Sequence, residues 1–367
     1  MPSAEQSIAP RARVPLAPLS TLGVGGEAEW YVRADTIEDV AAAHRWSGER
    51  NLPLFVLGGG SNLVIADEGI GGLVLHIAMR GAEFLQQADE TVLRVGAGEP
   101  WDDIVSATVS RGLAGFECLS GIPGSAGGTP IQNVGAYGQE VAEVLQSVTA
   151  FDRHLGQAVT LTPLDCRFGY RTSRFKHDEA GRFIVCEMTF RLRQGSPTVA
   201  YPDVIAYLDS HAISSPTVTD VRNAVLAIRR RKAMVIDPAD PDTRSVGSFF
   251  MNPVVTREEH ERIAESVAGA SVPGFMLSSG QVKIPAAWLI ERAGFSRGHV
   301  NGRAGISSKH PLAIVNRGGA TAHDVLELAA RIKRQVGERF GIWLRPEPVF
   351  VGFHENREVE YLQKAIG

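Results

Sequence analysis

Three short polar segments contain residues that could carry out chemistry. Arg171 lies in a cluster of four cations at 167–176, and arginine binds carboxylate or phosphate through paired hydrogen bonds. Ser248 lies at the head of the aromatic run 247–253 with no histidine beside it, so its hydroxyl suits a proton donor better than a nucleophile. Glu347 lies between two prolines, which could hold its carboxylate in one place.

Each segment also has an ordinary structural interpretation. The cations around Arg171 could form a solvated basic edge. Ser248 could be a turn serine that caps a strand, and Glu347 could be an exposed acid in a proline-rich turn. The residues alone leave these alternatives open.

A glycine-rich run at 120–140 indicates an anion-binding loop. It contains six glycines and two prolines but no lysine or arginine, so it offers backbone rather than packing side chains. Consecutive N–H groups in such turns form concave sites for phosphate. Asn133, Gln132 and Tyr137 add polar or flat edges that could contact a ring system. A connector without a ligand is the alternative.

A second loop of this kind follows the apolar run 53–57, which is typical of a strand. Three glycines, Ser61 and Asn62 come directly after it, as expected of a pyrophosphate turn. Two such loops suit a dinucleotide. The P-loop is absent because no Gly-Lys pair occurs, and Gly23-x-Gly25-x-x-Ala28 runs into a strand where a Rossmann fingerprint needs a helix.

Composition predicts a globular enzyme with two or three domains. The chain has 367 residues, 44% hydrophobic and 21% charged, with a net charge of −4 that argues against nucleic acid as a partner. The three cysteines are widely spaced, which favours a reducing cytoplasm and predicts no metal site. No apolar run is long enough to span a membrane.

The hydrophobic pattern predicts a strand-rich α/β part followed by a smaller, more helical part. Strands are expected at 73–77, 91–95, 312–316 and 349–353, and residues 184–192 alternate as a half-buried strand does. Helices are expected at 101–111 and 285–293, and from capping boxes at Thr217, Thr256 and Thr321. The junction is expected near 215–235.

Together these segments resemble one family. GGGSN at 58–62, IPG…PIQNVGAYG at 122–138, YR at 170–171, GSFFMNP at 247–253 and LRPEPVF at 344–350 occur in one order. The chain is similar over about 18–353 to the UDP-N-acetylenolpyruvoylglucosamine reductases (MurB). The Val-Ala-Tyr-Pro-Asp segment resembles the tyrosine loop of the first subtype, although Pro202 stands where glycine is often found.

The resemblance implies an α/β fold of the vanillyl-alcohol-oxidase type, in which two subdomains bind FAD and a C-terminal α/β subdomain binds substrate. It implies a flexible tail at 1–19, a first FAD subdomain at 20–79 to which 347–367 return, a second at 80–228, and the substrate subdomain at 229–346. We expect non-covalent FAD, because Ser61 and Asn62 stand where covalent relatives attach flavin and His76 lies too far along the chain.

The resemblance also implies the roles of individual residues. Catalytic roles fall to Arg171, Ser248 and Glu347, and substrate contacts to Tyr170, Tyr201, Lys232 and Asn252. FAD contacts fall to Gly58, Gly59, Gly60, Ser61, Asn62, Ser120, Ile122, Pro123, Gly124, Gly127, Gln132, Asn133, Gly135, Ala136, Tyr137, Gly138 and Arg229.

The implied reaction is NADPH-dependent reduction of UDP-N-acetylglucosamine enolpyruvate in cytoplasmic peptidoglycan precursor synthesis. Hydride comes from flavin N5 and a proton from Ser248, while Arg171 and Glu347 stabilise the enediolate. Two alternatives remain: another flavin oxidoreductase of the same fold, or a non-catalytic protein that binds nucleotide sugars. Binding of FAD and turnover with NADPH distinguish them.

Overall fold

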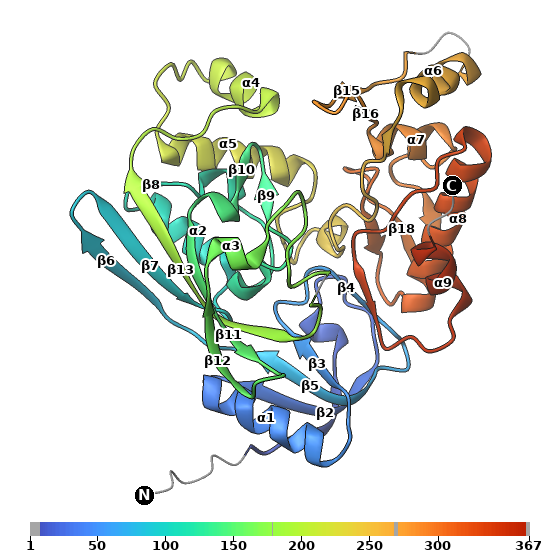
Figure 1. The fold of residues 1–367 in the computed structure, drawn as a ribbon. Coiled ribbons are helices and arrows are strands. Elements are labelled where there is room, and N and C mark those ends of the chain that lie inside the picture. The colour runs from blue at the N-terminus through green and yellow to red at the C-terminus, as the bar shows by residue number, and fades with distance from the viewer. Residues whose placement is uncertain (1–7, 178, 268–270, 365–367) are drawn as a thin grey trace, which may run out of the picture. The chain divides into compact units, whose positions relative to one another are not determined.

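The computed structural model describes residues 8–177, 179–267 and 271–364, and Figure 1 shows its helices and strands. Contacts group the chain into two compact units. The first holds the described residues up to 14 with 28–60 and 71–235; the second holds 15–27, 61–70 and the described residues from 236 onward. The chain therefore passes from one unit to the other inside the first glycine loop, between Gly60 and Ser61.

The first unit contains a four-stranded sheet in the order β1-β2-β5-β3. Its strands are β1 (Arg11–Pro15), β2 (Glu27–Ala34), β5 (Ile70–Ile77) and β3 (Leu54–Leu57). Helix α1 (Ile37–Glu49) begins at a capping box in which the Thr36 side chain accepts from the N–H of Asp39. Because residues 11–15 form a strand beside β2, the prediction of a flexible tail over 1–19 is wrong for these residues.

A larger antiparallel sheet has the order β12-β11-β13-β7-β6, with β8 also paired to β13. Its strands are β12 (Gln157–Leu161), β11 (Leu145–Asp152), β13 (Phe183–Gln194), β7 (Glu90–Gly96), β6 (Ala82–Gln87) and β8 (Leu113–Ala114). The predicted alternation in β13 is confirmed, since Met188, Phe190 and Leu192 are buried and Arg191 is exposed. Residues of both sheets, such as Leu73 and Phe190, belong to one hydrophobic core.

Helices pack against this core, and α5 contains the candidate site residue Arg229. The helix predicted at 101–111 is found as α2 (Trp101–Val109), two residues shorter, and its Trp101 ring packs edge-on against Phe116 at a centroid distance of 4.8 Å. Helix α5 (Val218–Arg231) begins at the predicted capping box of Thr217. The remaining elements are α3 (Pro163–Cys166), α4 (Pro202–Ser210), β9 (Gly135–Ala136), β10 (Gln139–Glu140), and the 3-10 turns η2 (Glu117–Leu119), η3 (Ala126–Gly128) and η4 (Val141–Glu143).

The second unit packs short strands against helices. One sheet consists of β14 (Val254–Val255), β16 (Val282–Lys283) and β15 (Phe275–Met276). Another consists of β17 (Val300–Asn301), β18 (Ala304–Ile306) and β19 (Ile314–Asn316). A third pairs β4 (Leu63–Ile65) in parallel with β20 (Val349–Val351). The helices are α6 (Arg257–Ser266), α7 (Ala286–Arg292), α8 (Ala322–Phe340) and α9 (Arg357–Gln363), with 3-10 turns η1 (Ala17–Leu19) and η5 (Pro241–Thr243). The capping boxes predicted at Thr256 and Thr321 begin α6 and α8.

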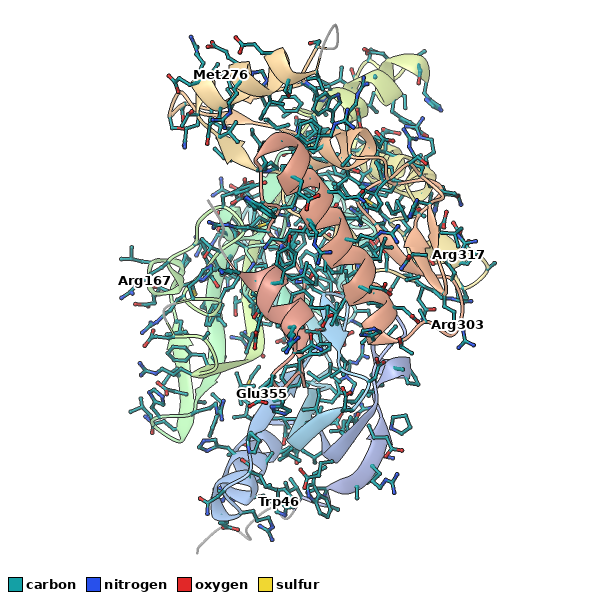
Figure 2. The ribbon with its side chains drawn as sticks, turned by 90° about the vertical axis from the view of Figure 1, so that its right-hand side faces the viewer. Trp46, Arg167, Met276, Arg303, Arg317 and Glu355 are labelled. Carbon is teal, nitrogen blue, oxygen red and sulfur yellow. The ribbon has the colours of Figure 1, made fainter. Side chains whose placement is uncertain are left out.

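Helix α8 organises this unit through its apolar face and one buried cation. Val325, Leu328, Ile332 and Val336 are buried as predicted; Figure 2 shows this part of the chain with its side chains. The buried Lys333 ammonium donates to three main-chain carbonyls, of Tyr361, Leu362 and Lys364, and so caps the end of α9.

Among the described helices, none combines the length and apolar character needed to cross a bilayer.

Candidate functional site

The two glycine loops of the first unit lie against each other. The Gly59 N–H donates to the Ser125 hydroxyl at 3.1 Å. A Cβ atom on Gly59 would lie 2.5 Å from the nitrogen of Ser125 and 2.6 Å from the Cα of Gly124. Only glycine permits this approach, so the two loops pack main chain against main chain, and we refer to this pair of loops as the cradle.

Two charged side chains hold the second loop in place. The Asp102 carboxylate accepts from the Gly121 N–H at 2.6 Å and pairs with Arg222 at 2.7 Å. Burial alone would raise the pKa of Asp102, but the hydrogen bonds from Arg222 and Gly121 outweigh it and lower that pKa. The carboxylate is therefore anionic at neutral pH and fixes the turn that precedes Gly124.

Arg229 places an incompletely satisfied cation beside this turn. Its guanidinium is only 9% exposed and donates to the carbonyls of Gly121 and Met234, at 3.2 and 2.8 Å. Its Nε has no hydrogen-bond partner among the described residues. Burial lowers the pKa of Arg229, and the charge of Arg171 lowers it further. A buried cation in this state is stabilised by an anion, so the residues present fit a phosphate-bearing cofactor or substrate.

Other predicted cofactor residues hold the loop together internally. The Asn133 amide donates to the Glu140 carboxylate at 2.6 Å and the Gly169 carbonyl at 3.1 Å, and its oxygen accepts from the Ala142 N–H. Ser120 donates to the carbonyl of Glu117. Their contacts to a cofactor stay predictions, as do those of Ile122, Pro123, Gly127, Gln132, Gly135, Ala136 and Gly138 along the same loop.

Three tyrosines and a lysine are linked through ring, electrostatic and ion-pair contacts, which Asp203 shares. The rings of Tyr137 and Tyr201 meet edge-on at a centroid distance of 5.2 Å. The pKa of Tyr201 is raised, first by burial and then by the charges of Asp203 and Tyr170. Lys232 closes α5 and pairs with Asp203 at 3.2 Å. The first unit thus brings together three of the four residues predicted to contact substrate.

Arg171 lies in a tight turn with an unusual backbone. The main-chain groups of Gly169 and Thr172 exchange two hydrogen bonds, of 3.1 and 3.2 Å. Arg171 has a φ of 55°, which is uncommon for a residue with a side chain and is often found at functional sites. Its effect on the pKa of Arg229 places both cations in one electrostatic environment.

The second unit brings Ser248 and Glu347 together. The Glu347 N–H donates to the Phe249 carbonyl at 2.9 Å, and Phe250 forms a bridge with Pro346. Both Ser248 and Glu347 are half-buried. Asn252 lies on the same segment, and its side-chain oxygen accepts from the Ala286 N–H at the start of α7. Its NH₂ group is the part of the amide left to contact a substrate.

The first glycine loop is divided between the units. Gly58–Gly60 belong to the cradle described above, whereas Ser61 and Asn62 belong to the second unit. The Asn62 amide donates to the Glu347 carbonyl at 3.3 Å, and the Asn62 carbonyl accepts from the Val349 N–H at 2.9 Å. The sequence predicted neither contact, and a pyrophosphate contact of Ser61 or Asn62 stays a prediction.

Sequence reasoning missed several supporting residues. Ser125 carries a hydroxyl group inside the glycine-rich run, and this position could have indicated that its side chain supports the loop. Asp102 is an acid in the first turn of a predicted helix, which indicates a helix start rather than a partner for Gly121. The buried Glu117 carboxylate accepts from Gln139 and from the N–H groups of Thr198 and Gly115, and no local pattern indicates this.

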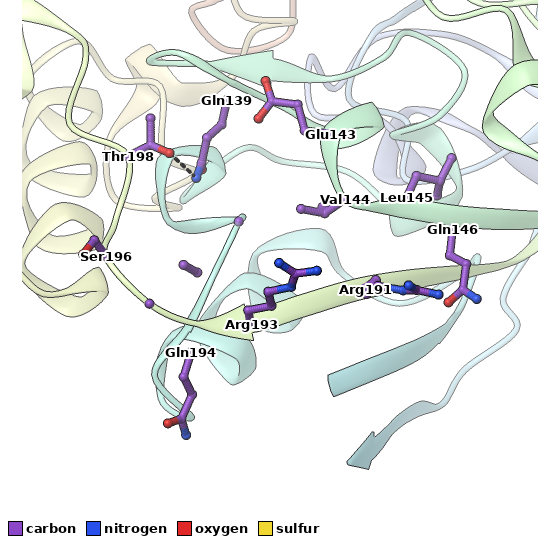
Figure 3. Close-up of a pocket in the computed structure, with 13 residues that line it drawn as sticks. Gln139, Glu143, Val144, Leu145, Gln146, Arg191, Arg193, Gln194, Ser196 and Thr198 are labelled. Carbon is purple, nitrogen blue, oxygen red and sulfur yellow. Dashed lines mark hydrogen bonds between the residues drawn. The ribbon is translucent and has the colours of Figure 1, made fainter. Parts of the chain in front are cut away.

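A groove of about 710 Å³ in the first unit contains none of the predicted site residues (Figure 3). Gln139 and Thr198, joined at 3.0 Å, line it near the root of the tyrosine loop. The guanidinium groups of Arg191 and Arg193 both pair with Glu90, and Glu143 adds a second carboxylate to the lining. We assign no role to this groove.

Two family models match separate parts of this chain. Residues 28–162 match the model of an FAD binding domain, and residues 238–351 match that of the UDP-N-acetylenolpyruvoylglucosamine reductase C-terminal domain. Two curated relatives bear the name UDP-N-acetylenolpyruvoylglucosamine reductase. The one from Streptomyces coelicolor is 48% identical over 92% of this chain and 89% of its own, and the one from Thermobifida fusca is 45% identical over 92% and 97%.

Among solved structures, the UDP-N-acetylenolpyruvylglucosamine reductase (MurB) of Thermus caldophilus aligns with a TM-score of 0.65 at 28% identity. The alignment covers 94% of this chain and 99% of that one. The predicted fold class, an α/β FAD-binding fold with a C-terminal substrate subdomain, is confirmed. The predicted boundaries between three subdomains stay a prediction.

Proposed function

This chain belongs to the UDP-N-acetylenolpyruvoylglucosamine reductase family, and we propose that it reduces UDP-N-acetylglucosamine enolpyruvate to UDP-N-acetylmuramate with NADPH. It is an FAD-dependent oxidoreductase of peptidoglycan synthesis. The observation that carries the proposal is the 48% identity to a named reductase over 92% of the chain. We further propose that the reaction takes place in the cytoplasm.

The cradle between the two glycine loops is proposed to hold FAD without a covalent bond. Main-chain N–H groups of these loops would donate to the pyrophosphate, and the guanidinium of Arg229, whose Nε has no partner among the described residues, would compensate negative charge. FAD held there would supply the hydride-transfer chemistry between NADPH and the enolpyruvyl double bond. The closed approach of Gly59 to Ser125 explains why side chains are excluded from this part of the loop.

Tyr201, Lys232 and Asn252 are proposed to hold the nucleotide diphosphate, and Tyr170 is proposed as a further substrate contact. Lys232 would exchange its ion pair with Asp203 for the diphosphate, which carries more negative charge than one carboxylate. Tyr201 is 45% exposed and packs against Tyr137, so its ring is presented to solvent from a supported position. The NH₂ group of Asn252 would add a hydrogen bond.

Arg171, Ser248 and Glu347 are proposed to act on the enolpyruvyl carboxylate and the carbon next to it. Addition of hydride to the terminal carbon places negative charge on the carboxylate as an enediolate. Arg171 would stabilise this charge by direct pairing, and Glu347 as a neutral acid or through a shared proton. Ser248 would donate a proton to the adjacent carbon, since the enediolate is a strong base and nearby cations lower the cost of the alkoxide.

Turnover of the purified protein tests the proposed function. The FAD-loaded chain is expected to consume NADPH only when UDP-N-acetylglucosamine enolpyruvate is present, and to give a product heavier by two hydrogens in mass spectrometry. UDP-N-acetylglucosamine, which lacks the enolpyruvyl group, is the control and is expected to give no turnover. NADPH consumption at the same rate with either sugar nucleotide, or without any, would overturn the proposal.

A further inference from the structure

The two prolines around Glu347 remove the main-chain donors from its immediate neighbours. Proline has no N–H, so the segment Pro346-Glu347-Pro348 offers only the N–H of Glu347 itself. That N–H is used, because it donates to the Phe249 carbonyl at 2.9 Å. The parallel ladder between β4 and β20 begins only at the pair Leu63 and Val349. Glu347 therefore lies just before the point where regular strand pairing begins.

Asn62 lies where this ladder begins and adds a side-chain contact to Glu347. Its side-chain NH₂ donates to the Glu347 carbonyl at 3.3 Å, and its own carbonyl accepts from the Val349 N–H at 2.9 Å. One residue thus contacts the chain on both sides of Pro348. With its N–H held by Phe249 and its carbonyl held by Asn62, Glu347 has both of its peptide groups fixed.

A second contact ties the Asn62 segment to the Ser248 segment. The Thr21 hydroxyl lies 2.9 Å from the carbonyl of Ser245 and 3.4 Å from the carbonyl of Ser61. Ser61 precedes Asn62, and Ser245 lies three residues before Ser248. The three segments that carry Asn62, Ser248 and Glu347 are therefore cross-linked by hydrogen bonds within the second unit.

We infer that Asn62 is a positioning residue for Glu347, holding the carboxylate where the proposed reaction needs it. The inference rests on the proposed role of Glu347. It differs from the expectation that Asn62 contacts the FAD pyrophosphate, since a positioning residue affects the step in which Glu347 acts and leaves cofactor binding intact. Small displacements of a reacting group are costly, on the order of 100-fold for about 1 Å.

The test separates the two half-reactions in Asn62→Ala and Asn62→Asp. Asn62→Asp keeps the shape of the side chain but replaces the donor NH₂ by an acceptor oxygen, so it guards against a packing defect in the alanine variant. Asn301→Ala is the control, because this asparagine of the same unit accepts from Arg331 instead. Bound FAD is measured by absorbance after gel filtration, and the two half-reactions by anaerobic stopped flow with NADPH and then with the enolpyruvyl sugar nucleotide.

We expect both variants to retain FAD, to be reduced by NADPH at the parent rate, and to be reoxidised by substrate about 10- to 100-fold more slowly. If Asn62 acts through Glu347, Asn62→Ala combined with Glu347→Gln is reoxidised no more slowly than Glu347→Gln alone. Reoxidation at the parent rate, loss of FAD, equal slowing of both half-reactions, or multiplicative effects in the double variant would each overturn the inference. A parent protein that NADPH reduces but substrate does not reoxidise would instead overturn the proposed function, and this inference with it.

Discussion

The main-chain N–H of Glu347 donates a 2.9 Å hydrogen bond to the carbonyl of Phe249, the residue that follows Ser248. The Met251 N–H donates a 3.0 Å bond to the Arg345 carbonyl, and Phe250 and Pro346 form a bridge between these two contacts. Phe249 itself is buried in the core of the second unit. The proposed proton donor Ser248 and the proposed acid Glu347 thus lie on two segments that are hydrogen-bonded to each other, and variants at either are expected to affect the same step.

Gly59→Ala is expected to lower FAD retention strongly. The new Cβ would lie within 2.6 Å of backbone atoms of Ser125 and Gly124, so the two loops must separate and the cradle is lost. FAD absorbance per protein after gel filtration measures the effect. Gly128→Ala is the matched control, because a Cβ there meets nothing within 4 Å and its φ is not positive. Equal FAD content in both variants would contradict the cradle.

Lys232→Ala is expected to weaken binding of the sugar nucleotide by about 2 kcal/mol, seen as a higher KM with unchanged reduction by NADPH. The reason is that diphosphate charge loses its compensating cation. An unchanged KM would show that Lys232 does not contact the diphosphate.

Asp203→Asn is expected to lower the same KM by up to about fivefold, because Asp203 competes for the Lys232 ammonium in an exposed ion pair worth no more than about 1 kcal/mol. Asp209→Asn lies on the same helix and changes the net charge equally, so it is the control. If both asparagine variants change KM alike, the effect comes from net charge and not from release of Lys232.

Stability is expected to fall as the pH drops below about 6.5, in part through His76. Its ring is hydrogen-bonded to the Tyr31 hydroxyl at 2.7 Å, and burial, with the charges of Arg33 and Arg80, lowers its pKa. The unfolded chain therefore binds a proton that the folded chain resists, so the free energy of unfolding decreases from pH 6.5 downward until the folded-state pKa is passed. Urea titrations at pH 7.5 and 5.5 measure this difference.

His76→Gln is expected to reduce the pH dependence without abolishing it, because burial also lowers the pKa of His44 and His299. A variant with the full parental difference between the two pH values would exclude His76 as a contributor.

The sequence predicted those features of the fold that depend on local patterns. Capping boxes at Thr217, Thr256 and Thr321 mark helix starts because the side chain and N–H groups involved lie within one turn. The alternation at 184–192 identified β13 because one of its faces is buried. The predicted strand at 312–316 is shorter, beginning at Ile314, because the N–H of Ala313 is used in a turn with His310.

The sequence could not predict contacts between distant segments. Asn62 and Glu347, or Gly59 and Ser125, meet only because of the tertiary fold, and nothing in either local sequence indicates the partner. Likewise, the sequence predicted one phosphate-binding turn at 58–62, whereas the last two residues of this loop belong to the second unit. Residue types indicated which chemistry to expect, and the structure shows which groups are already engaged in holding the loops.

The most direct measurement of the central claim is the anaerobic reaction of Ser248→Ala in two steps. NADPH is added first, and bleaching of the flavin is expected at close to the parent rate, because this step creates no carbanion that needs a proton. UDP-N-acetylglucosamine enolpyruvate is added next, and return of flavin absorbance is expected to be about 100- to 10,000-fold slower than in the parent. Glu347→Gln and Arg171→Ala are expected to show the same selective loss. Reoxidation of Ser248→Ala at the parent rate would contradict the account and leave Ser248 as a turn serine at the end of a strand.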